Sequence, residues 1–282
     1  RTVLLEWIIG CRLVPGRALK SISSRDQAIT LAGVVGVSGL AWLYLFYDAS
    51  RMALMSMNTG GMGDMNARLL GTPFDPLSLA LMFVMWSVMM VAMMLPSASP
   101  AIVMYSTLAR KRKETGSAIA PAWLFTLGYL AVWTAFSALA TGLQFGLQEA
   151  ALLTEMMVLR SARLSGLLLM AAGIYQWLPI KDACLQKCRA PLQYFMFNWR
   201  PGNAGAFLMG AEHGGFCLGC CWAIMLLLFV AGVMNLLWVA VIAVFVLIEK
   251  LIPNGAFVGR FSGLAMIVLG GSLLFGFWGP QA

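Results

Sequence analysis

Charged residues are scarce in this sequence. Asp, Glu, Lys and Arg together make up 11% of the 282 residues, whereas hydrophobic residues make up 61%. Soluble globular domains carry about 25% charged residues, so this composition excludes an ordinary soluble domain. What the chain does have is a series of apolar runs, several of them long enough to cross the roughly 30 Å hydrocarbon core of a bilayer as helices.

The sequence also lacks the motifs of several enzyme classes. It contains no P-loop, no H-E-x-x-H zinc motif and no G-x-S-x-G nucleophile motif. Its one histidine cannot supply both axial ligands of a bis-histidine haem. Machinery for hydrolysis, ATP-driven work or haem redox chemistry is therefore not visible, and we expect a protein that is not an enzyme.

Acidic residues are few, 11 against 19 basic residues, and the basic residues are unevenly placed. With seven spans and a cytoplasmic N-terminus, fifteen Lys and Arg residues fall on inside segments and four on outside segments. This asymmetry follows the positive-inside rule. Because the charges are scattered over separate loops, they do not suit nucleic-acid binding, but they do suit contact with anionic membrane lipids.

The sequence thus predicts an all-α fold, a polytopic transmembrane helix bundle of six or seven spans with a cytoplasmic N-terminus. Residues 1–26 are expected to form a cytoplasmic amphipathic segment on the membrane surface. Residues 27–277 are expected to form a single transmembrane domain with an outside loop at 48–76 and an inside loop at 179–205. The predicted spans are about 27–47, 77–105, 118–146, 163–178, 206–231, 234–249 and 258–277.

Cysteines lie close to the only histidine. His213, Cys217, Cys220 and Cys221 have offsets of 0, 4, 7 and 8 residues, which place them within roughly a quarter of a helix circumference. They are predicted at the mouth of the fifth span, on the cytoplasmic side, where thiols stay reduced. Thiolates with one imidazole suit Cu(I) or zinc rather than Mg or Ca. Alternatively, the cysteines only pack in an apolar core. The neighbouring Glu212 is either an acceptor for the imidazole N–H or a boundary charge.

A second cysteine pair follows the fourth predicted span. Cys184 and Cys188 are one helical turn apart and could clamp one metal ion or form a redox pair. Because Lys181, Lys187 and Arg189 surround them, we expect depressed thiol pKa values and reactive sulfurs. The alternative is two cysteines at a basic boundary without a shared role.

Methionine is abundant, with twenty residues, and many of them lie in two groups. Thioethers stay soft outside the cell and suit Cu(I), so copper is favoured over zinc. The alternative for both groups is packing between helices. In the second predicted span, Pro96 and Pro100 are expected to bend or end the helix. The outside loop supplies Met52, Met55, Met57, Met62 and Met65, and the second span supplies a helical stripe of Met82, Met85, Met89 and Met93, widened by Met90 and Met94.

A few polar residues lie near predicted membrane depth, where such residues are suspected of function. These are Tyr129, Gln176, Asn235 and the pair Glu249-Lys250. For the pair, which ends a predicted span, interfacial anchoring is an equally good explanation.

Several motifs occur together in this chain: 89–96 (Met-Met-Val-Ala-Met-Met-Leu-Pro), 173–191, 217–222 (Cys-Leu-Gly-Cys-Cys-Trp) and 232–235 together with Glu249-Lys250. In this combination they resemble one bacterial family of predicted metal-binding integral membrane proteins. The resemblance implies a helical membrane fold, a place in the bacterial inner membrane and binding of a metal.

The leading hypothesis is a membrane protein that binds or passes Cu(I) from the outside Met loop to the Cys/His cluster. Its partner would be a copper enzyme, a larger membrane complex or a copper carrier. One alternative is a structural or accessory subunit of a larger membrane enzyme complex. A further alternative is a thiol–disulfide relay that uses the cysteine pairs. The oligomeric state and the direction of transport stay open.

Overall fold

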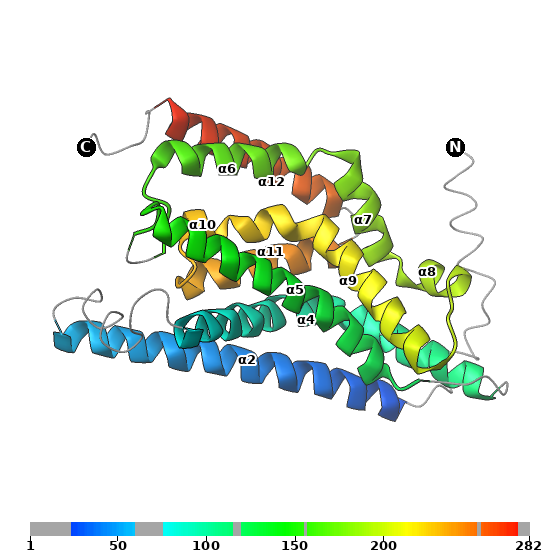
Figure 1. Ribbon diagram of the computed structural model, residues 1–282. Helices are drawn as coiled ribbons and strands as arrows, with labels where there is room; N and C mark the ends of the chain where they lie inside the picture. Colours follow the sequence, from blue (N-terminus) through cyan, green and yellow to red (C-terminus); the bar gives the residue numbers. More distant parts are fainter. Residues whose placement is uncertain (1–23, 60–75, 115–119, 155–156, 253–254, 276–282) are drawn as a thin grey trace.

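A computed structural model describes residues 24–59, 76–114, 120–154, 157–252 and 255–275, and this part of the chain is helical apart from short turns and one isolated bridge between Leu153 and Leu159 (Figure 1). The all-α prediction is confirmed. The predicted segment 1–26 lies almost entirely outside the described residues. The helices are α2 (Ser24–Thr59), α4 (Pro76–Glu114), α5 (Ala122–Glu149), α6 (Ala162–Tyr175), α7 (Pro179–Arg189), α8 (Pro191–Phe197), α9 (Gly202–Leu226), α10 (Leu228–Ala231), α11 (Leu236–Leu251) and α12 (Gly255–Leu274).

Within the described ranges, five helical stretches are long and apolar enough to cross a membrane. Each overlaps a span predicted from the sequence. The predicted fourth and sixth spans correspond to α6 and α11, which are shorter helices of 14 and 16 residues. The five long stretches are Gln27–Arg51, Pro76–Arg112, Ala122–Glu149, Gly202–Ala231 and Gly255–Leu274.

Two expected loops contain helices. Helix α2 continues to Thr59, so Met52, Met55 and Met57 lie on its last turns and not in an irregular loop. Met62 and Met65 lie outside the described residues. The expected inside loop at 179–205 contains α7 and α8, each of which begins with a proline. Proline favours the first position of a helix because its fixed φ is already helical and its missing N–H would have no intrahelical partner there.

Helix α4 runs through Pro96 and Pro100 without ending, so of the two expected outcomes, a bend or an end, the end is excluded. Each proline lacks an N–H and therefore leaves the carbonyl four residues earlier without its helical partner. The carbonyl of Ala92 accepts a hydrogen bond from Trp42 Nε1 of α2 at 3.1 Å, and that of Pro96 accepts one from Ser99 Oγ at 2.8 Å. These replacement donors allow the helix to continue past both prolines.

The helices pack in neighbouring pairs that Figure 1 shows side by side. Helix α2 lies along one edge against α4, α6 and α12 lie together along the opposite edge, and α5 and α9 lie between them. Helices α5 and α9 approach through glycines: a Cβ at Gly214 would lie 3.1 Å from the carbonyl oxygen of Tyr129. Close approach of this kind brings the buried face of α9 directly against α5.

Candidate metal centre

The four residues that the sequence placed on one helical face are all buried on α9. Their exposed fractions are 3% for His213, 1% for Cys217 and Cys220, and 0% for Cys221. The prediction of a position at the mouth of a span is wrong, because α9 begins at Gly202. Fifteen residues at 1.5 Å each put Cys217 about 22 Å along the helix, well inside the bundle.

The α9 thiols lie beside a thioether of α4. Cys220 and Cys221 donate hydrogen bonds to the carbonyl of Cys217 at 3.0 and 2.9 Å, and Cys221 Sγ lies 3.9 Å from Met94 Sδ. Two sulfurs that bind one ion at about 2.3 Å each lie roughly 3.7 to 4.6 Å apart, depending on coordination geometry. The separation between Cys221 and Met94 therefore already matches that of two sulfur ligands of one ion.

Helix α7 brings the second cysteine pair to the same place. Cys188 forms a side-chain hydrogen bond with Cys220. Cys184 Sγ lies 2.8 Å from the position of a Cβ at Gly219, so only glycine at 219 leaves room for that sulfur. The two pairs that the sequence treated separately thus meet where α7 packs on α9.

The expected depression of the pKa values of Cys184 and Cys188 is wrong. Burial raises the pKa of Cys184, and the nearby charge of Lys187 offsets this only in part. The hydrogen bond with Cys220, together with burial, raises the pKa of Cys188 well above its usual range. The basic residues around α7 therefore do not make these two thiols acidic, because removal from water outweighs their charge.

A buried lysine of α11 reaches the same sulfurs. Lys250 is 8% exposed, and its Nζ donates to Cys217 Sγ at 2.8 Å and to Ser97 Oγ of α4 at 3.0 Å. Tyr129 of α5 donates to the carbonyl of Met94 at 3.0 Å, and its hydroxyl also lies 3.0 Å from Cys217 Sγ. Cys217 is therefore held by side chains from two other helices.

The residue before Lys250 forms a separate buried ion pair. Glu249, 1% exposed, pairs with Lys181 of α7, and Lys181 also donates to the side chain of Gln176. Both Glu249 and Lys250 are buried inside the protein, so interfacial anchoring does not explain these two residues. Asn235 has a local role instead, because its side chain accepts from Leu237 N and caps the start of α11.

His213 stands apart from the thiols in its contacts. Its ring lies 6.0 and 6.1 Å from the rings of Phe125 and Tyr129, and its Nδ1 is buried without a hydrogen-bond partner. Glu212 does not accept from the imidazole, because it pairs with Arg200 at 2.6 Å and accepts from Tyr194. An unpartnered buried nitrogen is costly and leaves a lone pair or a proton available to a ligand.

Most of the predicted methionine stripe is buried in the bundle. Met85 is half-buried, and Met89 and Met93 are 2% and 1% exposed. The contact with Cys221 comes from Met94, which the sequence gave only as a widening of the stripe. Sequence reasoning therefore named Met94 and Lys250 but did not assign either one to the metal centre.

In the described part of the chain, no group of three or more His, Cys, Asp or Glu residues is already arranged to hold a metal ion. The thiols form hydrogen bonds with one another and with the backbone. Metal binding would require these side chains to turn toward a common point. The chemistry of the set nevertheless fits a soft monovalent ion, since it combines thiols, one thioether and one free imidazole nitrogen.

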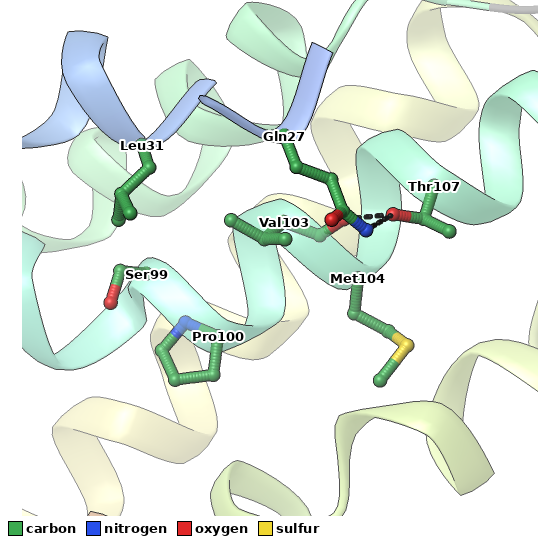
Figure 2. A pocket seen from close by; sticks show the side chains of 7 residues that line it. All are labelled: Gln27, Leu31, Ser99, Pro100, Val103, Met104 and Thr107. Atoms are coloured by element: carbon green, nitrogen blue, oxygen red, sulfur yellow. Dashed lines mark hydrogen bonds between the residues drawn. The ribbon is translucent and has the colours of Figure 1, made fainter. Parts of the chain in front are cut away.

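A surface hollow lies elsewhere, between α2 and α4 (Figure 2). Its volume is about 360 Å³, and Gln27 donates to Thr107 at 3.2 Å along its wall. Its lining is mostly apolar and contains one thioether, that of Met104, but no thiol, so it lacks the sulfur cluster that a soft metal requires.

Comparison with known families gives a match that concerns copper. Residues 83–273 match the model of the family PpoB2, described as copper chaperone. The chain belongs to this family. The matched region contains α5 to α11 complete and the described thiols, together with Met94 and Lys250. No curated protein and no solved structure matches significantly. The family description agrees with the expected association with copper.

Proposed function

We propose that this protein is a membrane-embedded copper chaperone that holds Cu(I) among the sulfurs at the junction of α4, α7 and α9. The proposal is carried by the meeting of Cys188, Cys217, Cys220 and Cys221 with Met94 in the buried centre of a chain of the copper chaperone family. Thiolates and thioethers select Cu(I) over hard cations. The protein is not an enzyme in this proposal.

Transfer of the ion would proceed by exchange of one sulfur ligand at a time. The Met-rich segment containing Met52, Met55 and Met57 would capture Cu(I) outside, and Met94 with Cys221 would receive it within the bundle. Cys220 with Cys188 would form the next sulfur pair, on the side of α7. We place the protein in a bacterial inner membrane with a cytoplasmic N-terminus, and a copper enzyme or a cytosolic carrier would be the acceptor.

A thiol–disulfide relay receives less support. Such a relay needs a thiolate to attack a disulfide, and the raised pKa values of Cys184 and Cys188 reduce the thiolate fraction at neutral pH. The described cysteines are all free.

The test is the copper content of detergent-purified protein prepared anaerobically, in competition with a Cu(I) chelator. We expect the wild type to retain copper and the combined replacement of Cys217, Cys220 and Cys221 by Ser to abolish retention. Gly215→Ser is the matched control, because it adds a hydroxyl to the same helix at a position with no neighbour within 4 Å. Equal retention in the triple variant would contradict the proposal.

Protection from alkylation gives a second readout on the unmodified protein. Cu(I) or Ag(I) should slow alkylation of Cys220 and Cys221, identified by mass spectrometry, relative to metal-free protein. This measurement does not depend on whether the triple variant folds.

A further inference from the structure

Lys250 is a buried positive charge without a carboxylate partner. Among the described residues, no ion pair includes Lys250, since the neighbouring carboxylate of Glu249 is taken by Lys181. Its ammonium hydrogen-bonds a hydroxyl and the sulfur of Cys217. A buried charge requires a compensating partner, and the negative charge of a thiolate is the one that these contacts offer.

The lysine comes from a different helix than the thiols and is fixed from both sides. Ser97 of α4 and Cys217 of α9 hold the Nζ atom at 3.0 and 2.8 Å, with Tyr129 also against the Cys217 sulfur. A side chain held in this way stays beside any ion that the α9 sulfurs bind. An ion bound to Cys217 at about 2.3 Å would lie within roughly 5 Å of the ammonium.

We propose that Lys250 makes the centre selective for a monovalent soft cation over a divalent one; this inference rests on the proposed copper function. Two thiolates, one Cu(I) and one ammonium sum to zero charge, whereas the same set around Zn(II) or Cd(II) carries an excess positive charge. Net charge is costly in a bundle interior that excludes water. Lys250 is thus a positioning and selectivity residue and not itself a ligand.

The size of the effect follows from Coulomb's law. At an effective dielectric constant of about 20, two unit charges about 5 Å apart repel by an amount equivalent to roughly a hundredfold in affinity. A divalent ion experiences this repulsion twice and a monovalent ion once. Loss of the Lys250 charge should therefore improve the binding of a divalent ion relative to a monovalent ion by about a hundredfold.

The experiment measures the affinities for Ag(I) and Cd(II) of the full detergent-purified chain, by competition with chelators under anaerobic conditions. In Lys250→Met, we expect the ratio of the Ag(I) to the Cd(II) affinity to fall by about a hundredfold. Lys250→Arg keeps the charge and should keep the ratio. Lys187→Met removes an exposed charge that lies 4.1 Å from the ring of Phe216, and it should leave the ratio unchanged.

A second variant tests the charge without removing the lysine. Ser97→Asp places a carboxylate beside Nζ and should lower the ratio as Lys250→Met does, whereas Ser97→Ala should not. This pair decides the question if Lys250→Met fails to fold. If the affinity ratio in Lys250→Met or Ser97→Asp stays within threefold of that of the wild type, the proposal is overturned. This holds even if both affinities fall, because a purely structural role would weaken the binding of both ions alike. A wild type that binds no Ag(I) would instead refute the proposed copper function.

Discussion

The α6–α12 pair and the junction of α4, α7, α9 and α11 are both buried helix contacts, but different types of residue form them. In the first, a Cβ at Gly166 would lie 2.7 Å from the carbonyl of Gly270, and one at Gly173 would lie 2.6 Å from that of Gly263. In the second, sulfur, ammonium and hydroxyl groups occupy the contact.

This difference in composition distinguishes a contact that only packs helices together from a contact that can bind a ligand. Helices that meet at glycines gain van der Waals contact through their closely spaced backbones, and they can do so without any reactive group. A buried lysine and a cluster of thiols give weaker packing and carry a desolvation cost. Residues of this kind at the centre of an apolar bundle are typical of a ligand-binding site, whereas the glycine contact between α6 and α12 is typical of a scaffold.

The largest effect is expected from breaking the ion pair that ties α11 to α7. Glu249→Ala should lower the free energy of unfolding by about 3 to 5 kcal/mol, because it removes the only carboxylate that pairs with the buried charge of Lys181 among the described residues. The double replacement of Lys181 by Met and Glu249 by Leu should recover most of this loss. Unfolding in detergent measures both, and a double variant that is no more stable than Glu249→Ala would contradict the explanation.

The stability of the α6–α12 glycine contact should depend only on the size of a substituted side chain. Gly173→Leu should cost about 1 to 3 kcal/mol or more, because the new side chain would meet the backbone of α12. Gly271→Leu is the matched control on α12, where a Cβ would have no neighbour within 4 Å. The copper content per folded molecule should stay that of the wild type in both, and a loss of copper in Gly173→Leu would show that the scaffold and the centre are not separable.

Within the centre, the thioether of Met94 can be separated from its neighbours. Met94→Leu should weaken Cu(I) binding at least about tenfold, since even outer-sphere partners of a metal site contribute 10- to 100-fold. The change in stability should stay under about 1.5 kcal/mol, because the volumes are similar. Met90→Leu, also fully buried but without a described sulfur contact, should leave the affinity unchanged. Chelator competition measures the affinity, and equal effects of the two variants would count against Met94 as a ligand.

The smallest effect concerns the edge of the centre, on α7. Because burial raises the pKa of Cys184, its neutral thiol persists to higher pH than that of an exposed cysteine, and alkylation at neutral pH should be slow. Lys187→Ala removes a charge that lowers this pKa, so alkylation should slow further. The change should be less than about threefold, because the charge is exposed and screened. Mass spectrometry of the Cys184 peptide at several pH values measures it, and faster alkylation in the variant would contradict the sign.

Much of the fold could be predicted because the positions of long apolar helices depend on the local sequence. The lengths of the apolar runs located α4, α5, α9 and α12 to within a few residues, apart from the basic end of α4, which continues to Glu114. What local sequence left open was whether the helix bends or ends at its prolines. Helix α4 continues past Pro96 because Trp42, fifty residues before Ala92, supplies a donor to the Ala92 carbonyl. No local pattern records such a donor.

The centre could be predicted only in its intrahelical part. Helical spacing placed Cys217, Cys220 and Cys221 on one face, and the structure buries them together. The sequence favoured Met89 and Met93, but the rotation of α4 about its axis brings Met94 to Cys221. Adjacent helical positions differ by about 100°, so one residue along the chain decides which thioether faces α9.

The sequence by itself determined the apolar helices, their approximate ends and the shared face of the cysteines, because each depends on composition or on the period of one helix. The tertiary structure alone decided that Lys250 meets Cys217, that Glu249 pairs with Lys181 and that α7 carries Cys188 to Cys220. These contacts join residues tens of positions apart. Their geometry depends on how closely neighbouring helices approach and how each is rotated, and that is fixed by packing between helices.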